Sequence, residues 1–161
     1  MLGGDGDDHI FGGDGDDAIH GGSGKNILDG GAGNDILVAG SVDDQIDGGQ
    51  GIDTMRIVSD IQTLDFSVNR PASIEILDTR NNAVTQTTLH TADVFAFNNT
   101  HSVRVWADSV DEFVLHGFAF DRSTVDGDLV ELTYAGLEQS ETVEITIVAG
   151  QSFEPDIILA A

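Results

Sequence analysis

The sequence predicts an all-β fold made of a short repetitive part followed by a longer, non-repetitive part. Residues 3–56 form six nine-residue units in unbroken register: GGDGDDHIF, GGDGDDAIH, GGSGKNILD, GGAGNDILV, AGSVDDQID and GGQGIDTMR. A fixed short period with an acidic and an apolar residue in phase is typical of a solenoid of stacked strands. After Arg56 the period stops and short alternating segments follow. We therefore predict a parallel β-roll of six nonapeptide repeats followed by a β-rich C-terminal cap.

The last three residues of each unit predict a short strand with one side chain pointing inward. Their central residue, at position eight, is always apolar: Ile10, Ile19, Leu28, Leu37, Ile46 and Met55. The six residues before them are rich in glycine, which adopts positive φ at little cost. This piece therefore predicts a turn that directs backbone carbonyl oxygens inward.

The sixth position of each unit indicates a calcium ligand. It holds Asp8, Asp17, Asn26, Asp35, Asp44 and Asp53. Ca²⁺ takes six to eight oxygens, from carboxylates and backbone carbonyls. Residues 1–56 contain twelve Asp and no Glu, although a merely solubilising acidic face would use either. Two other interpretations fit the repeats less well. A disordered acidic linker would not keep an apolar residue at every ninth position. An EF-hand would need a Glu at the last ligand position of its calcium loop.

These repeats resemble those of RTX proteins, the calcium-dependent proteins exported by bacterial type I secretion. The resemblance implies that two repeats make one coil and that each ion lies between turns two repeats apart. One turn is expected to give carbonyls at positions one and three, and the next turn at positions two and four. The backbone ligands so implied are Gly3, Asp5, Gly12, Asp14, Gly21, Gly22, Ser23, Gly24, Gly30, Gly31, Ala32, Gly33, Gly40, Val42, Gly49 and Gly51.

The two edges of such a roll are unequal in this sequence. The even repeats keep every motif glycine and an Asp at each sixth position. The odd repeats carry the neutral Asn26 beside Lys25, and repeat five has Ala39 and Val42 in place of glycines. Fewer ligand charges weaken Ca²⁺ binding. We expect about four Ca²⁺ ions, the strongest between repeats two and four and between four and six.

Composition narrows the classes of partner. The 161 residues carry a net charge of −23, and both parts are acidic, which argues against nucleic acid and anionic membranes. The sequence contains no run of roughly 18 apolar residues, so it predicts no transmembrane helix. Cysteine is absent, and no basic, apolar signal precedes the repeats. We expect a monomer, and an array cut from a longer protein at Met1.

The second part, residues 57–161, predicts a cap over the open end of the roll, closed by antiparallel strands. Predicted strands are Thr63–Val68, Ser73–Leu77, Ser102–Ala107, Glu112–His116, Leu129–Tyr134 and Thr142–Val148. Asp126-Gly127 predicts a hairpin turn, while Ala92–Phe97 fits either a helical turn or a strand. Some outward-facing apolar residues of the roll should be covered by the cap or by a neighbouring protein: Phe11, Ile27, Ile36 and Val38.

Most of residues 57–136 resembles the C-terminal modules of very large RTX adhesins. The resemblance rests on Ile74–Asp78, Asn81-Asn82, HTADVFAF, HSVRVWADSVDEFVLHG and VDGDLVELTYAG. The chain departs from the common form in having His116, Gly117 and Phe118 where a turn with Gly and Trp is usual. Phe153–Ala161 resembles the end of a type I secretion signal, which would occupy about 110–161. Ile157–Leu159 equally fit a last strand of the cap.

No motif in the sequence indicates catalysis. Neither HExxH nor GxSxG occurs, and the histidines have no spaced partners: His9, His20, His90, His101 and His116. Trp106 is expected in the cap core, and Asp60, Asp65 and Asp78 are left open as extra calcium ligands. We expect a non-enzymatic calcium-binding module, secreted or at the cell surface, that supports type I secretion of an adhesin. Two alternatives stay open: a polysaccharide-binding roll like those of alginate-modifying enzymes, or the non-catalytic tail of a protease or lipase.

Overall fold

The structure, a computed structural model, describes residues 1–41, 44–58, 63–66, 70–81, 85–98, 100–107, 111–126, 129–138, 141–150 and 156–160. Its described elements are strands and one short helix, α1 (Thr91–Phe97). The roll contains β1 (Leu2–Asp5), β2 (His9–Asp14), β3 (Ala18–Ser23), β4 (Ile27–Ala32), β5 (Ile36–Ala39), β6 (Gln45–Gln50) and β7 (Thr54–Ile57). The cap contains β8 (Thr63–Asp65), β9 (Ile76–Asp78), β10 (Gln86–His90), β11 (Ser102–Trp106), β12 (Glu112–His116), β13 (Phe118–Asp126), β14 (Leu129–Glu138), β15 (Glu141–Gly150) and β16 (Asp156–Ala160). The predicted all-β fold, a parallel roll followed by a β-rich cap, is confirmed.

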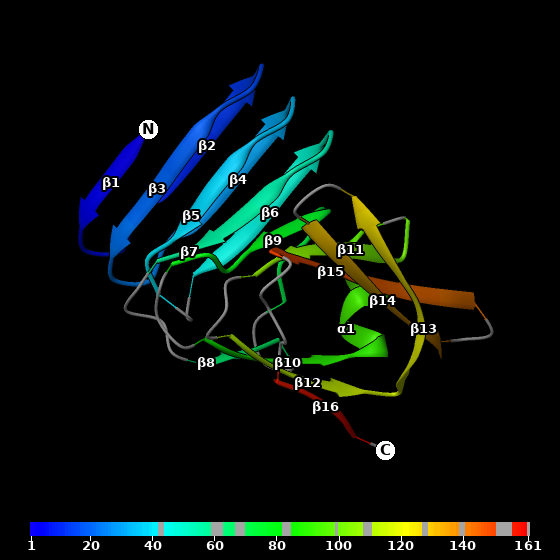
Figure 1. Cartoon of the computed structure of the whole chain (residues 1–161). Helices are drawn as coiled ribbons and strands as arrows, with labels where there is room; N and C mark the ends of the chain where they lie inside the picture. Colours follow the sequence, from blue (N-terminus) through cyan, green and yellow to red (C-terminus); the bar gives the residue numbers. More distant parts are fainter. Residues whose placement is uncertain are drawn as a thin grey trace.

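Two nonapeptides make one coil of the roll. Strands β1, β3, β5 and β7 pair in parallel in one layer, and β2, β4 and β6 pair in parallel in the other (Figure 1). The register advances by eighteen residues per coil, as in Ile10↔Leu28 and Ala18↔Ile36. Between the layers lie the buried position-eight side chains, Ile19, Leu28, Leu37, Ile46 and Met55. The expected alternation of odd and even repeats on opposite edges follows from this register.

The strands are longer than the three residues predicted for each repeat. β3, for example, continues through Gly21, Gly22 and Ser23, the first three positions of the next unit. Stacking explains the first glycine, because a Cβ on Gly12 would lie only 2.2 Å from the carbonyl oxygen of Gly30. Backbone conformation explains the second and fourth, since Gly22 and Gly24 have φ of +91° and +108°. The turn itself is therefore confined to positions four to six.

The cap extends the roll before closing it. β9, β11 and β15 continue the layer of β7 in parallel, and β8, β10, β12 and β16 form a second parallel sheet. β14 and β13 then add to β15 in antiparallel pairing. α1 contacts β10, β11, β14 and β15, with Val94 fully buried (Figure 1). One hydrophobic core runs from the roll into the cap.

The local predictions for the cap have mixed outcomes. β12 has the predicted bounds, and Ala92–Phe97 proves helical. β13 and β14 pair up to Asp126↔Leu129, as the hairpin signal predicts, although residues 127–128 lie outside the described residues. Strand Ser73–Leu77 begins later, at Ile76, since Ser73 has a φ of +52°. β10 was not predicted, because its sequence QTTLH has no apolar alternation.

The structure also places the outward-facing apolar residues of the roll and the C-terminal segment. Phe11 and Ile27 remain exposed on the roll, while Ile36 and Val38 are half-buried. Ile157–Leu159 lie in β16, which pairs with β12. The preceding part of the expected secretion signal, residues 151–155, lies outside the described residues. No described helix is long and apolar enough to cross a membrane.

Candidate calcium sites along the edges of the roll

Position-six side chains form a hydrogen-bonded column along each edge of the roll. On the even edge, the Asp17 amide donates to Asp35 Oδ1, and the Asp35 amide donates to Asp53 Oδ1, both at 2.7 Å. On the odd edge, the Asp8 amide donates to Asn26 Oδ1 at 3.0 Å, and the Asn26 amide donates to Asp44 Oδ1 at 2.8 Å. One oxygen of each later side chain therefore ties two successive coils together.

The second carboxylate oxygen is the feature that points to a cation. Oδ2 of Asp8, Asp35 and Asp53 is buried and has no hydrogen-bond partner among the described residues. The first glycine of the repeat leaves space beside it, since a Cβ on Gly30 would lie 2.4 Å from Asp35 Oδ2. A buried carboxylate without a partner is costly, so such groups are normally paired or bound to a metal. These oxygen donors fit a hard cation such as Ca²⁺.

Electrostatics on the even edge lead to the same conclusion. Burial raises the pKa of Asp53, and the negative charges of Asp35, Glu75 and Asp47 raise it further. The hydrogen bond from the Asp35 amide offsets only part of this effect. Carboxylates stacked this closely repel one another when ionised. The even edge is therefore a column of negative charge that a cation would neutralise.

Around Asp44, the odd edge satisfies its negative charge with the chain's own donors. Asn26 Nδ2 donates to Asp44 Oδ1 at 3.1 Å. The amides of Gly40 and Ser41 donate to Asp44 Oδ2 at 2.9 and 3.0 Å. In repeat five, which lacks two motif glycines, the backbone amides at positions two and three thus bond the carboxylate at position six of the same repeat. The Asp44 carboxylate, between repeats three and five, is therefore already hydrogen-bonded at both oxygens. A cation is less needed there than beside Asp35 and Asp53 on the even edge.

A second, outer column runs through position five of the repeats and was not predicted from the sequence. Asp7 Oδ1 accepts from the Lys25 amide at 2.8 Å, and Asp16 Oδ1 accepts from the Asn34 amide at 2.7 Å. Asn34 Oδ1 accepts in turn from the Ile52 amide at 2.9 Å. The recurrence of Asp or Asn at position five was the available signal. These bonds link exposed turns and leave the inner column for a cation.

The expected backbone ligands lie in the last residues of the strands and at the start of the turns that follow, at both edges. Those placed by the structure are Gly3, Asp5, Gly12, Asp14, Gly21, Gly22, Ser23, Gly24, Gly30, Gly31, Ala32, Gly33, Gly40, Gly49 and Gly51; Val42 lies outside the described residues. Within the described ranges, no three His, Asp or Glu side chains gather as a metal cluster. An ion held here would therefore draw on carbonyl oxygens as well as carboxylates.

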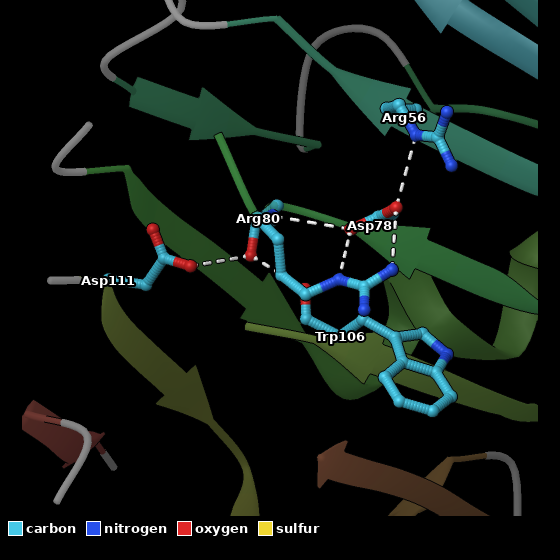
Figure 2. A network of polar contacts seen from close by, with 6 residues as sticks. Arg56, Asp78, Arg80, Trp106 and Asp111 are labelled. Atoms are coloured by element: carbon cyan, nitrogen blue, oxygen red, sulfur yellow. Dashed lines mark hydrogen bonds and ion pairs between the residues drawn. The ribbon is translucent and has the colours of Figure 1, made fainter. Parts of the chain in front are cut away.

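Among the extra acids considered in the cap, Asp78 is held by the chain's own cations. Asp78 is paired with two arginines: its Oδ2 lies 3.1 Å from Arg56 Nε, and its Oδ1 lies 2.8 Å from Arg80 Nε (Figure 2). Burial alone would raise the pKa of Asp78, but Arg80 and Arg56 lower it overall. Asp65 is exposed, and Asp60 lies outside the described residues.

Two aromatic expectations in the cap need correction. Trp106 is half-exposed and not in the core, and the Arg80 guanidinium lies 4.9 Å from its ring centroid (Figure 2). Trp106 follows the buried Val105 in β11. Because successive side chains of a strand point to opposite faces, Trp106 points outward. His90 and His116 do have a partner, since β10 and β12 pair and stack their rings 4.2 Å apart.

The stacked parallel strands and the two carboxylate columns are typical of a calcium-binding β-roll. Residues 1–28 and 20–55 match the family model of the RTX calcium-binding nonapeptide repeat, in four copies. No curated protein matches the sequence. Among solved structures, the chain is similar to the AlgE6R3 subunit of the Azotobacter vinelandii mannuronan C5-epimerase, at 21% identity, 90% coverage of this chain, 72% of that chain and a TM-score of 0.36. A TM-score this low carries no conclusion about activity or substrate.

Proposed function

We propose that this chain is a non-enzymatic module that folds on binding Ca²⁺ outside the cell and supports type I secretion of an RTX adhesin. In this proposal residues 3–56 form the calcium-dependent roll. Residues 57–161 form the cap and carry the secretion signal at about 110–161. Nonapeptide repeats of this family are typical of secreted proteins, which supports the proposed location.

The observation that carries the proposal is the burial of the Oδ2 atoms of Asp8, Asp35 and Asp53, which have no hydrogen-bond partner among the described residues. Each repeat buries only one large apolar side chain, while its glycines lose much conformational freedom on ordering. Ionised Asp35 and Asp53 repel each other in the metal-free column. Bound Ca²⁺ would supply the missing positive charge, and its binding free energy would become folding free energy. The chain would therefore be unfolded where Ca²⁺ is scarce.

Far-UV circular dichroism of the full chain during a Ca²⁺ titration from chelator tests the folding step, with Mg²⁺ as control. We expect a cooperative gain of β-structure with Ca²⁺ alone, because the smaller Mg²⁺ demands a tighter, near-octahedral site. A spectrum already rich in β-structure in chelator, and unchanged by Ca²⁺, would contradict calcium-dependent folding.

Export is tested separately, in a bacterium that carries a type I secretion apparatus. The full chain should be found in the medium, and a chain truncated after residue 109 should stay inside. A matched truncation that removes the same number of residues from the N-terminal repeats should preserve export. Equal export of both shortened chains would contradict a signal at 110–161.

Polysaccharide binding remains a second candidate because the half-exposed Trp106 presents an aromatic surface under Arg80. Against an acidic sugar, the arginines of the cap are already paired with acids: Arg70 with Asp93, Arg80 with Asp78, Arg104 with Glu131, and Arg122 with Asp121. Calorimetric titration with alginate oligomers would favour this candidate if the heat of binding saturates. A Trp106→Phe variant serves as the control.

A further inference from the structure

We propose that Glu75, outside the repeats, completes an additional Ca²⁺ site with Asp53 at the junction between roll and cap. The inference rests on the proposed calcium binding of the roll and adds to it a ligand that the nonapeptide pattern does not contain. The ligand is a divalent cation that prefers oxygen donors. Three features of the described residues place Glu75 in this role.

Strand register makes residues 75–78 the equivalent of positions six to nine of a repeat. β9 pairs with β7 as Thr54↔Ile76, Met55↔Leu77 and Arg56↔Asp78. Ile76 therefore takes position seven, and Leu77, only 1% exposed, takes the inward position eight. Glu75 precedes Ile76 just as Asp53 precedes Thr54. The segment EILD repeats the pattern of DILV in repeat four, with Glu in place of Asp.

Backbone hydrogen bonds continue through Glu75 in the same way. In the roll, the Thr54 amide donates to the Asp35 carbonyl at 2.8 Å. One coil later, the Ile76 amide donates to the Asp53 carbonyl at 3.0 Å, and the Arg104 amide donates to the Glu75 carbonyl at 2.8 Å. Glu75 thus occupies the next step of the even edge.

The side chain of Glu75 also repeats the position-six bond. Its Oε2 accepts from the Asp53 amide at 2.9 Å, as Asp53 Oδ1 accepts from the Asp35 amide at 2.7 Å. Asp53 is fully buried, and its Oδ2 has no hydrogen-bond partner among the described residues. The even column therefore runs through four acids, Asp17, Asp35, Asp53 and Glu75.

A shortened turn explains why Glu, and not Asp, stands here. A Cβ on Gly48 would lie 2.1 Å from the Ser73 carbonyl oxygen, just as one on Gly30 would lie 2.4 Å from that of Gly48. Ser73 therefore takes position one, and only Ile74 separates it from Glu75, where a repeat has four residues. The longer side chain of Glu spans the space that the missing turn leaves.

The column ends one coil later. Arg104 pairs with Ile76, so the residue before it, Val103, stands at the next position-six place. Val103 is apolar and 2% exposed, and it packs in the core. Glu75 is consequently the last carboxylate of the even edge, and the site it would form with Asp53 is the one nearest the cap.

Native mass spectrometry of the full chain at saturating Ca²⁺ tests the proposal by counting bound ions. Glu75→Gln keeps an oxygen that can accept from the Asp53 amide but removes the charge. We expect this variant to bind one ion fewer than the unmodified chain. Glu112→Gln, which makes the same change on β12 where Glu112 bonds Gln86, should bind the full number. An unchanged count in Glu75→Gln would overturn the inference.

A second measurement on the unmodified chain does not depend on how the variant folds. An anomalous-scattering map of calcium-containing crystals should show a peak in contact with both the Asp53 and Glu75 carboxylates. Peaks between repeats two and four and between four and six, with none at Glu75, would overturn the inference while leaving the proposed function intact. A chain that binds no Ca²⁺ at all would instead overturn the proposed function itself.

Discussion

The even and odd edges of the roll share one backbone design but differ in how they handle the negative charge of Asp35 and Asp53 on one side and of Asp44 on the other. On the even edge, Asp35 and Asp53 are buried, each with one oxygen bonded to the preceding coil and one without a partner among the described residues. On the odd edge, Asn26, Gly40 and Ser41 supply donors to Asp44. On the proposed calcium binding, this difference predicts that the geometry of the turn alone does not make a calcium site. The negative charge left unsatisfied inside the turn should determine where an ion binds.

The largest effect should come from Asp35→Asn, because this residue stands in the middle of the even column. The change removes a buried charge but keeps an oxygen for the Asp17 amide. We expect the Ca²⁺ concentration at the folding midpoint to rise on the order of 10- to 100-fold. Asp16→Asn is the matched control, since Asp16 is exposed at position five, where Asn34 already serves the same role. Equal midpoints in the two variants would contradict the assignment of Asp35.

Asn26→Asp should make the odd edge resemble the even edge. The substitution removes the Nδ2 donor to Asp44 and adds a buried negative charge. We expect roughly tenfold tighter Ca²⁺ binding, because more ligand charge strengthens such sites, and a less stable metal-free chain. Calorimetric titration with Ca²⁺ measures the first effect. Weaker Ca²⁺ binding in this variant would show that the neutral Asn26 is itself the better ligand.

Acid should partly replace calcium on the even edge. The pKa of Asp53 is raised above its ordinary value of 3.8, so the folded metal-free roll holds a proton more tightly than the unfolded chain. Its stability contribution is fully present below pH 3.8 and is lost as the pH rises through the raised pKa. Circular dichroism of the metal-free chain should therefore show β-structure increasing as the pH falls through the raised pKa of Asp53 toward its ordinary value of 3.8.

The pKa of Asp78 is shifted in the opposite direction, so this group affects stability only below the pH range in which Asp53 titrates. Its contribution is present above its ordinary value of 3.8 and is lost only as the pH falls through the lowered value. Asp53→Asn should flatten the rise in β-structure, whereas Asp78→Asn should leave its shape unchanged. A rise that persists fully in Asp53→Asn would assign the proton to another group.

The smallest effect should follow Arg80→Ala in the cap. It removes a half-exposed guanidinium that bonds Asp78 and stacks on Trp106. We expect a loss of about 1 kcal/mol in the stability of the calcium-bound chain, since Arg56 still pairs with Asp78. The Ca²⁺ midpoint should stay unchanged. A shifted midpoint would mean that the cap and the ion sites are coupled through β7 and β9.

Much of the roll could be predicted from the sequence because its period encodes stacking directly. Position eight supplies one buried side chain per repeat, and Gly22 shows why a small residue with positive φ recurs. The place of Glu75 in the even column could not be predicted in this way. Its place depends on the pairing of β9 with β7, a long-range register that the shortened turn hides from the nine-residue pattern.

The cap was harder to predict because its strands depend on neighbours distant in sequence. QTTLH becomes β10 only because β8 and β12 lie on both sides of it. Trp106 alternates with the buried Val105, which turns it outward against the usual preference of tryptophan for the core. The two arginines on Asp78 likewise come from β7 and from the segment after β9.

Residue-resolved hydrogen exchange during a Ca²⁺ titration tests the contrast between the two edges most directly. The amides to follow are those that donate to position-six oxygens: Asp17 and Asp35 on the even edge, Asp8 and Asn26 on the odd edge. We predict that the even-edge amides become protected at lower Ca²⁺ concentration. Protection that appears first on the odd edge, or on both edges without Ca²⁺, would contradict the account.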